Sequence, residues 1–154
     1  MKYTAFLFFR KPAASFFAGL VLLPLSRKLC YDQKKRKGDR RMPYIDSKIT
    51  VKLSDSKKEE IKSAMGKLIA TLGKSEDYLM VGIEDSYDLW FGGRKLEIGA
   101  YVAVSLLGDA PKEKYEKLTG EICGLLAAEL DIPGDAVYVT YHPVSNWGWN
   151  GNNF

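Results

Sequence analysis

The fold is decided by residues 42–73, which read MPYIDSKITVKLSDSKKEEIKSAMGKLIATLG. In residues 44–51 polar and apolar side chains alternate, a pattern typical of a strand with one buried face. Ser56 is followed three residues later by Glu59, the spacing of a capping box that opens a helix. The helix expected over residues 56–72 repeats apolar residues at helical spacing: Ile61, Met65, Leu68 and Leu72. This stretch therefore predicts a strand followed by a helix.

The chain after this stretch continues with further strands. Residues 78–84 (YLMVGIE) and residues 96–107 (LEIGAYVAVSLL) are rich in residues that favour strands, and residues 90–93 (WFGG) between them predict a turn. The first helix would then join two parallel strands. This order is the start of a strand-helix-strand unit.

The same order recurs in the last third of the chain. A second helix is expected to begin near Pro111 and to end before Pro133 and Gly134, and residues 136–141 (AVYVTY) predict the last strand. The apolar stripe of this helix comprises Tyr115, Leu118, Ile122, Leu125, Leu126 and Leu130. Two such units predict an α/β (α+β) fold, a four-stranded sheet with two helices on one face. The other face, expected to be aliphatic, would be uncovered, so oligomerisation is expected.

Charge is distributed unevenly along the 154 residues. Residues 1–41 hold eleven Lys or Arg and two acids, whereas residues 42–154 hold twelve basic and seventeen acidic residues, and the two parts together give the net charge of +4. The chain length fits one globular domain, residues 42–154, with an N-terminal extension, residues 1–41. Because the expected domain is acidic, no nucleic-acid partner is expected.

The extension has several interpretations, which the sequence leaves open. Its longest uncharged apolar run, residues 12–26, has 15 residues and contains Pro24, whereas a membrane-spanning helix needs about 20. It resembles a signal peptide without an Ala-x-Ala cleavage site, or a transit peptide. Its basic end (residues 34–41) is typical of a solvated linker, or of a nuclear or anionic-surface signal. Translation beginning at Met42 is a further alternative. We therefore expect a cytoplasmic or secreted protein, with membrane contact only if the extension is retained.

Residues that would hold a metal or cofactor are scarce. His142 is the one histidine in the sequence, and Cys30 and Cys123 are too few for a disulfide framework. Cys123 is expected to pack as a small buried apolar residue. The pair Gly92-Gly93 lacks the lysine of a phosphate-binding loop. No metal and no cofactor are therefore expected.

Six short motifs stand in order along the expected domain. They are Met42-Pro43, Gly73-Lys74 with Tyr78 four residues after the lysine, Phe91-Gly92-Gly93, CGLLA at residues 123–127, VYV at residues 137–139, and WGWN at residues 147–150 with Phe154. Together they resemble the macrophage migration inhibitory factor family of the tautomerase superfamily, over residues 42–154. The resemblance implies a homotrimer with active sites between neighbouring subunits.

The resemblance also implies that the initiator methionine is removed and that Pro43 becomes the catalytic base. A free secondary amine has a basic lone pair, whereas a prolyl nitrogen inside a chain is an amide. An ordinary α-amino group titrates at about 7.7–8.0, and an apolar pocket with cations nearby lowers that pKa. The expected reaction is keto-enol interconversion of aromatic α-keto acids such as phenylpyruvate, and of dopachrome-type substrates.

Several further residues match positions at which the family binds its substrate. Lys74 is the candidate for the substrate anion, although a lysine after a helix also favours the helix dipole. The backbone N–H of Leu106 is expected to hold the carboxylate. Tyr138 is expected to act from a neighbouring subunit, although a strand tyrosine is also common in packing. Thr140 stands where many relatives have asparagine. Aromatic walls are expected from Tyr78, Trp147, Trp149 and Phe154, which a docked terminal tail would also explain.

Besides the enzyme, the sequence leaves open a second function of a different class. In this alternative the chain is a cytokine-like interaction protein with a protein receptor, which keeps the trimeric fold but lacks catalysis because Pro43 is not N-terminal. Some relatives carry a Cys-x-x-Cys pair where this chain has Ile98 and Tyr101, so no thiol-disulfide activity is expected.

Overall fold

The computed structural model describes residues 42–153, and the predictions for residues 1–41 and for Phe154 lie outside these residues. In chain order the elements are β1 (Pro43–Ile49), α1 (Asp55–Leu68), η1 (Ile69–Leu72), η2 (Glu76–Tyr78), β2 (Met80–Glu84), β3 (Trp90–Phe91), β4 (Arg94–Lys95), β5 (Ala100–Leu107), α2 (Lys112–Leu130), η3 (Gly134–Ala136), β6 (Val137–Val144), β7 (Gly148–Trp149) and β8 (Asn152–Asn153). Within this part of the chain, neither helix is long and apolar enough to cross a membrane.

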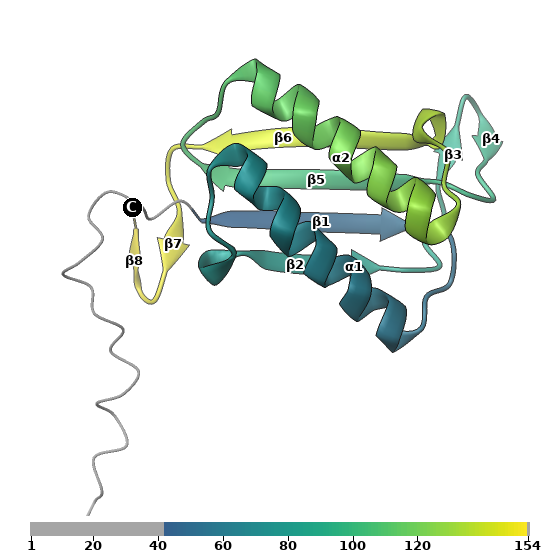
Figure 1. The fold of residues 1–154 in the computed structure, drawn as a ribbon, viewed down its shortest axis with the longest axis horizontal. Coiled ribbons are helices and arrows are strands. Elements are labelled where there is room, and N and C mark those ends of the chain that lie inside the picture. The colour runs from purple at the N-terminus through teal and green to yellow at the C-terminus, as the bar shows by residue number, and fades with distance from the viewer. Residues whose placement is uncertain (1–41, 154) are drawn as a thin grey trace, which may run out of the picture. The chain divides into compact units, whose positions relative to one another are not determined.

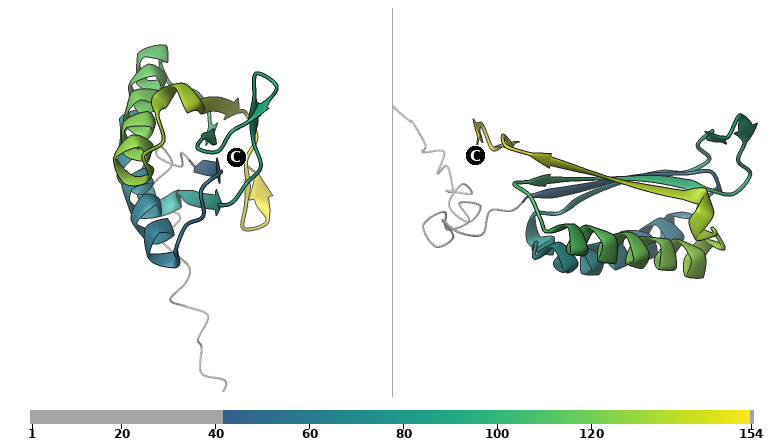
Figure 2. Two further views of the ribbon diagram at one scale, coloured as in Figure 1. Left: turned by 90° about the vertical axis from the view of Figure 1, so that its right-hand side faces the viewer. Right: turned by 90° about the horizontal axis from the view of Figure 1, so that it is seen from above.

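The main sheet has four strands in the order β2-β1-β5-β6. The pairs β1-β2 and β5-β6 are parallel, and the two units meet through the antiparallel pair β1-β5. Both helices cover the same face of the sheet (Figures 1 and 2). The predicted fold, two strand-helix-strand units with two helices on one face, is confirmed.

The N-cap of the first helix lies two residues earlier than expected. Its N-cap is Ser54, whose side chain accepts a hydrogen bond from the Lys57 N–H at 3.3 Å, so the capping box predicted at Ser56 does not form. The helix tightens into η1 and ends at Gly73, which adopts the left-handed conformation (φ 69°) that glycine tolerates best.

The core lies between the helices and the sheet. Every second residue of β1 and β5 faces the helices and is buried, as the alternation in the sequence predicts. Fully buried side chains from strands and helices meet there: Ile45, Ile49, Val102, Val104, Ile61, Met65, Ile122 and Leu126. Burying one such side chain contributes roughly 1.5–3 kcal/mol, and this packing holds the strand ends in place.

The face of the sheet opposite the helices is mixed and largely polar, so the aliphatic face expected from the sequence is wrong. On this face the Tyr101 hydroxyl lies 3.0 Å from Thr140 Oγ1, which lies 2.9 Å from His142 Nε2. The half-buried Asp46 and Lys48 of β1 lie on the same side. A partner on this face would therefore meet hydrogen-bonding groups rather than a dry apolar surface.

Two short hairpins project from opposite ends of the sheet, both on the side away from the helices (Figure 2). In the β3-β4 hairpin, Gly92 and Gly93 have φ angles of 56° and 79°, as a tight turn between two strands requires. The strand expected over residues 96–107 begins only at Ala100, because the preceding residues lead out of this hairpin. The β7-β8 hairpin follows β6 and lies at the end of the sheet where β1 begins (Figure 1).

Candidate active site

The candidate site lies at the end of the sheet where β1 begins. Pro43 is buried and stands opposite Leu106 in the antiparallel pair of β1 and β5. Met42, only 3% exposed, offers its carbonyl oxygen to the backbone N–H of Leu107 at 3.1 Å. In the chain as it stands, the Pro43 nitrogen is therefore an amide held inside the fold, and it cannot serve as a base.

Lys74 reaches the same strand end from the segment after the first helix. It follows Gly73, whose left-handed conformation turns the chain toward β5. The lysine is 6% exposed, and its Nζ donates a hydrogen bond to the carbonyl oxygen of Leu107 at 3.0 Å. Lysine is almost never this buried. This bond places the ammonium at the end of β5.

The peptide groups at the end of β5 point in alternating directions. Leu107 directs its N–H to β1, whereas Gly108 donates its N–H to the Val144 carbonyl oxygen of β6 at 2.9 Å. Because N–H directions alternate along a strand, the N–H of Leu106 also points to β6. The Leu106 side chain is fully buried. The donor that faces the start of β1 therefore belongs to Leu107, which no motif in the sequence indicated.

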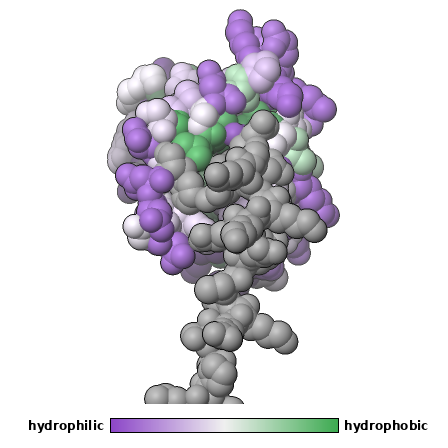
Figure 3. All heavy atoms as spheres, turned by 90° about the vertical axis from the view of Figure 1, so that its left-hand side faces the viewer, coloured by the Kyte–Doolittle hydropathy of each residue, from purple (hydrophilic) through white to green (hydrophobic). Residues whose placement is uncertain are grey.

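Aromatic side chains stand beside this strand end. The rings of Tyr78 and Trp149 meet edge to face, with 6.1 Å between their centroids. Trp149 is 42% exposed and Trp147 is half-buried. Figure 3 views the molecule from this end and shows an apolar patch within a mostly hydrophilic surface. Two of the expected aromatic residues, Tyr78 and Trp149, thus do lie together.

Tyr138 and Thr140, two further expected site residues, lie toward the end of the sheet away from Pro43. Tyr138 stands opposite Tyr101, whereas Pro143 of the same strand stands opposite Leu106, the partner of Pro43. The five residue steps from Tyr138 to Pro143 span about 16 Å of strand. Thr140 is bonded to side chains on the polar sheet face. One subunit therefore does not bring Tyr138 or Thr140 to Pro43.

Tyr138 belongs to an exposed aromatic cluster at its own end of the sheet. It is 59% exposed, and its ring meets Phe91 of the β3-β4 hairpin at 5.4 Å between centroids. A small cavity of about 120 Å³ lies beside the pair, lined among others by Trp90, Tyr101 and Asp135. Aromatic side chains this exposed are typical of a surface that contacts another molecule.

An acidic group lies near the Lys74 cation. The Tyr115 hydroxyl donates to Asp109 at 2.5 Å and holds the pKa of that carboxyl below its ordinary value of 3.8; the Ala110 N–H contributes, and the charge of Lys74 contributes more weakly. Burial, with the hydrogen bond to Asp109, raises the Tyr115 pKa to about 12. Asp109 therefore stays ionised and partly balances the buried ammonium. The sequence offered no signal for this residue.

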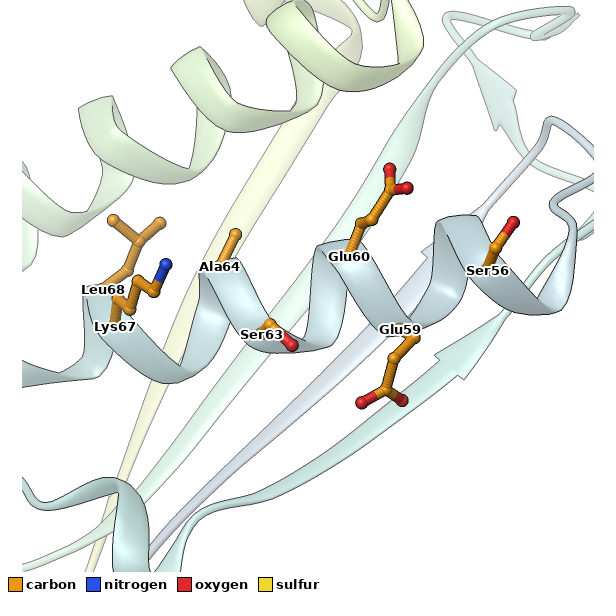
Figure 4. A pocket seen from close by; sticks show the side chains of 7 residues that line it. All are labelled: Ser56, Glu59, Glu60, Ser63, Ala64, Lys67 and Leu68. Atoms are coloured by element: carbon orange, nitrogen blue, oxygen red, sulfur yellow. The ribbon is translucent and has the colours of Figure 1, made fainter.

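A wider depression lies on the outer surface of α1 (Figure 4). Among residues 42–153, its lining comes from one helix: Ser56, Glu59, Glu60, Ser63, Ala64, Lys67 and Leu68. Glu60 pairs with Lys57 at 2.6 Å, and Glu59 pairs with Lys62. No expected site residue reaches it, so we interpret it as a solvated helix face. Among residues 42–153, no group of three His, Cys, Asp or Glu side chains could hold a metal ion.

Comparisons with known proteins place the chain in a family. The profile of the family described as "Macrophage migration inhibitory factor (MIF)" matches residues 42–154. Macrophage migration inhibitory factor of Rattus norvegicus is 31% identical over 91 residues, which cover 56% of this chain and 76% of the rat protein. The Xenopus laevis protein is 28% identical over 105 residues, covering 65% and 89%.

Solved structures give the same result. Leishmania major MIF2 superposes with a TM-score of 0.68 at 32% identity, covering 73% of this chain and 97% of that protein. The Entamoeba histolytica macrophage migration inhibitory factor-like protein superposes with a TM-score of 0.66 at 24% identity, covering 73% and 99%. These relatives consist almost entirely of the segment that corresponds to residues 42–154. The chain therefore belongs to the macrophage migration inhibitory factor family, and its family domain is residues 42–154.

Proposed function

We propose that residues 43–154 form a keto-enol tautomerase for aromatic α-keto acids such as phenylpyruvate, and for dopachrome-type substrates, with Pro43 as an N-terminal base. One observation carries this proposal: the buried Lys74 ammonium lies 3.0 Å from the carbonyl oxygen of Leu107, the residue whose N–H contacts the Met42 carbonyl next to Pro43. A cation at the same strand end as a potential secondary amine suits a substrate with a carboxylate beside its reacting carbon.

In the proposed mechanism, Pro43 with a free amine takes a proton from the carbon next to the substrate carbonyl. The electron pair of that C–H bond becomes the C=C bond of the enol, and the carbonyl oxygen gains the charge. The Lys74 ammonium holds the carboxylate, and Tyr78 with Trp149 packs against the aromatic ring. The proton returns to the oxygen or to the carbon, so the reaction needs no cofactor.

The proposed active unit is a homotrimer, in which Tyr138 of one subunit completes the site of its neighbour. The separation of about 16 Å along β6 supports this, because one subunit cannot bring Tyr138 to Pro43. The exposure of Tyr138 and Phe91 also supports it. Proteins of the same fold form trimers: fused 4-OT proteins, 13% and 18% identical to this chain with TM-scores of 0.63 and 0.64, are trimers.

The reaction class has a parallel in another protein of this fold. Pt0534, 19% identical with a TM-score of 0.60, is inactivated by 2-oxo-3-pentynoate, a 2-oxo acid like the proposed substrates.

The test compares phenylpyruvate turnover by the full chain and by a chain that starts at Pro43. Because the solved relatives consist of this segment, the shorter chain is expected to fold. Turnover should be found only in the shorter chain. Pro43→Gly keeps a terminal amine of a less suitable kind and should lower kcat, whereas Lys74→Ala should chiefly raise KM. An inactive, folded chain starting at Pro43 would contradict the proposal.

One observation favours a second function, a cytokine-like interaction protein. In the full chain Pro43 is an amide, and the residue before it is buried. A form that keeps Met42 would retain the fold and its surfaces without catalysis, and its function would then depend on a protein receptor. Equal and negligible turnover by both chains would favour this alternative.

A further inference from the structure

The small cavity beside the β3-β4 hairpin is lined mainly by aromatic rings. Its volume is about 120 Å³, and four of its lining side chains are aromatic: Trp90, Phe91, Tyr101 and Tyr138. Among residues 42–153, the one charged side chain in the lining is Asp135, which η3 places there. The proposed tautomerase uses neither Trp90 nor Asp135, so it does not explain this combination of rings and one carboxylate.

The rings come from separate segments that the fold brings together. Tyr101 of β5 stands opposite Tyr138 of β6, so these two rings rise from neighbouring strands roughly 4.8 Å apart. The β3-β4 hairpin supplies Trp90 and Phe91, and the Phe91 ring meets the Tyr138 ring edge to face, with 5.4 Å between centroids and 75° between planes. The Tyr101 hydroxyl lies 3.0 Å from Thr140 Oγ1, and this bond holds the Tyr101 ring in place. The lining is therefore formed before any ligand arrives.

The chemistry of the lining favours a cation. The faces of aromatic rings carry partial negative charge and attract cations, most strongly at tryptophan. The hairpin already contains one such contact, because the Lys95 ammonium lies 5.7 Å from the centroid of the Trp90 ring while it pairs with Asp88 at 2.6 Å. Lys95 does not line the cavity, and among residues 42–153 no basic side chain does. The carboxylate of Asp135 thus has no positive side chain beside it in the lining.

We propose that this cavity binds the quaternary ammonium group of a small molecule. A primary ammonium has three N–H donors, and burying a donor without an acceptor costs free energy. The lining has few acceptors for them, since the Tyr101 hydroxyl is engaged with Thr140. A quaternary nitrogen has no N–H, so rings and one carboxylate satisfy it.

The size of the cavity agrees with this class of ligand. An engineered apolar cavity of roughly 150 Å³ accepts benzene. The cavity of about 120 Å³ suits a slightly smaller group, such as a nitrogen that carries three methyl groups and one methylene. This inference goes beyond the proposed tautomerase and does not depend on it.

The experiment measures binding of choline and of tetramethylammonium to the full chain by calorimetry, at constant ionic strength and with potassium as the blank cation. The matched ligand is the neutral alcohol in which a carbon atom replaces the choline nitrogen, because it has the same shape and no charge. Choline should bind at least about tenfold more tightly than this alcohol, as expected for a desolvated cation on aromatic rings. This comparison needs no variant.

Two variants assign the site to the cavity. Asp135→Asn keeps the shape of the side chain and removes its charge, and Trp90→Leu keeps an apolar side chain and removes the ring. Each should weaken choline binding roughly 3- to 30-fold, and Asp135→Asn should leave the affinity for the neutral alcohol unchanged. The matched control is Asp131→Asn, which removes the same charge outside the lining, at a left-handed position (φ 55°) that asparagine tolerates. Urea unfolding establishes that each variant is folded.

Three results would overturn the inference. The first is no binding of choline or tetramethylammonium by the full chain at concentrations up to roughly 10 mM, and the second is equal affinity for choline and the neutral alcohol. The third is an equal loss of affinity in Asp131→Asn and Asp135→Asn, which would indicate the overall charge of the protein rather than this cavity. None of them depends on turnover, so an inactive chain starting at Pro43 would refute the tautomerase and leave this inference standing.

Discussion

The lysine at the proposed site allows a quantitative test. Lys74→Met in the chain starting at Pro43 keeps an unbranched apolar stem in the space of a side chain that is 6% exposed, and it removes the ammonium. A hydrogen bond to a charged group contributes about 1.5–3 kcal/mol, and each 1.4 kcal/mol is a factor of ten, so KM for phenylpyruvate should rise roughly 10- to 100-fold. The kcat should change less, because the Pro43 amine is untouched.

The assay measures enol formation from phenylpyruvate and from its methyl ester. The ester has no carboxylate, so its KM should be nearly the same in the Lys74→Met variant and in the unaltered protein. Lys67→Met is the matched control variant, since Lys67 lies in the exposed last turn of α1 and should leave both substrates unaffected.

Equal changes in KM for the acid and for the ester would refute the reasoning, as would no change in either. Lys74 would then have only a structural role, through its hydrogen bond to the Leu107 carbonyl oxygen. In that case the variant should lose stability in urea unfolding while its KM for phenylpyruvate stays the same.

Three further predictions concern assembly, packing and pH. Mixing Pro43→Gly subunits with Tyr138→Phe subunits, each expected to have a lowered kcat, should raise turnover above the sum of the two separate proteins, because some mixed sites contain both intact residues; no gain after verified subunit exchange would contradict shared sites. Ser47→Ala should raise the unfolding free energy by about 1–2 kcal/mol at fixed protein concentration, since Ser47 Oγ is fully buried without a hydrogen-bond partner in residues 42–153; a marked loss of stability would show that Oγ is bonded. The Lys58 ammonium, with a backbone N–H, lowers the Asp85 pKa from 3.8 to about 2, so this carboxylate stabilises the fold above pH 3.8 and the contribution is lost as the pH falls toward 2. In the Asp85→Asn variant, the unfolding free energy should therefore change less between pH 3.8 and pH 2. The same pH dependence in the variant and in the unaltered protein would count against the ion pair of Asp85 with Lys58.

Much of the fold could be predicted because buried side chains recur along the sequence at the period of a strand or a helix. The alternation in residues 44–51 assigned Ile45 and Ile49 to the core face, and both are fully buried. Element ends were harder to predict, because they depend on contacts that no local pattern contains. Ser54 and Ser56 are both suitable caps, and only the folded chain shows that the Ser54 hydroxyl receives the Lys57 N–H.

The site was predictable in its residue types but not in its geometry. The motif containing Lys74 marked the lysine, whereas its burial depends on where β5 ends, which the sequence does not fix. The direction of the Leu107 N–H is set by strand register, because a shift of one residue would exchange it with Leu106. The polar character of the free sheet face was not predicted, because the contact between Tyr101 and Thr140 joins two strands that are far apart in the sequence.

The order of strands in the sheet has a consequence for how subunits behave when they separate. In the described part of the chain, β2 and β6 are the outermost strands of the main sheet, and each has one side without a strand neighbour. Unpaired strand edges of this kind can pair with further copies of the chain. Pairing that does not close grows into fibres, whereas a closed ring leaves no edge unpaired and stops growing. Variants that break the ring are therefore expected to precipitate rather than to persist as dilute single subunits.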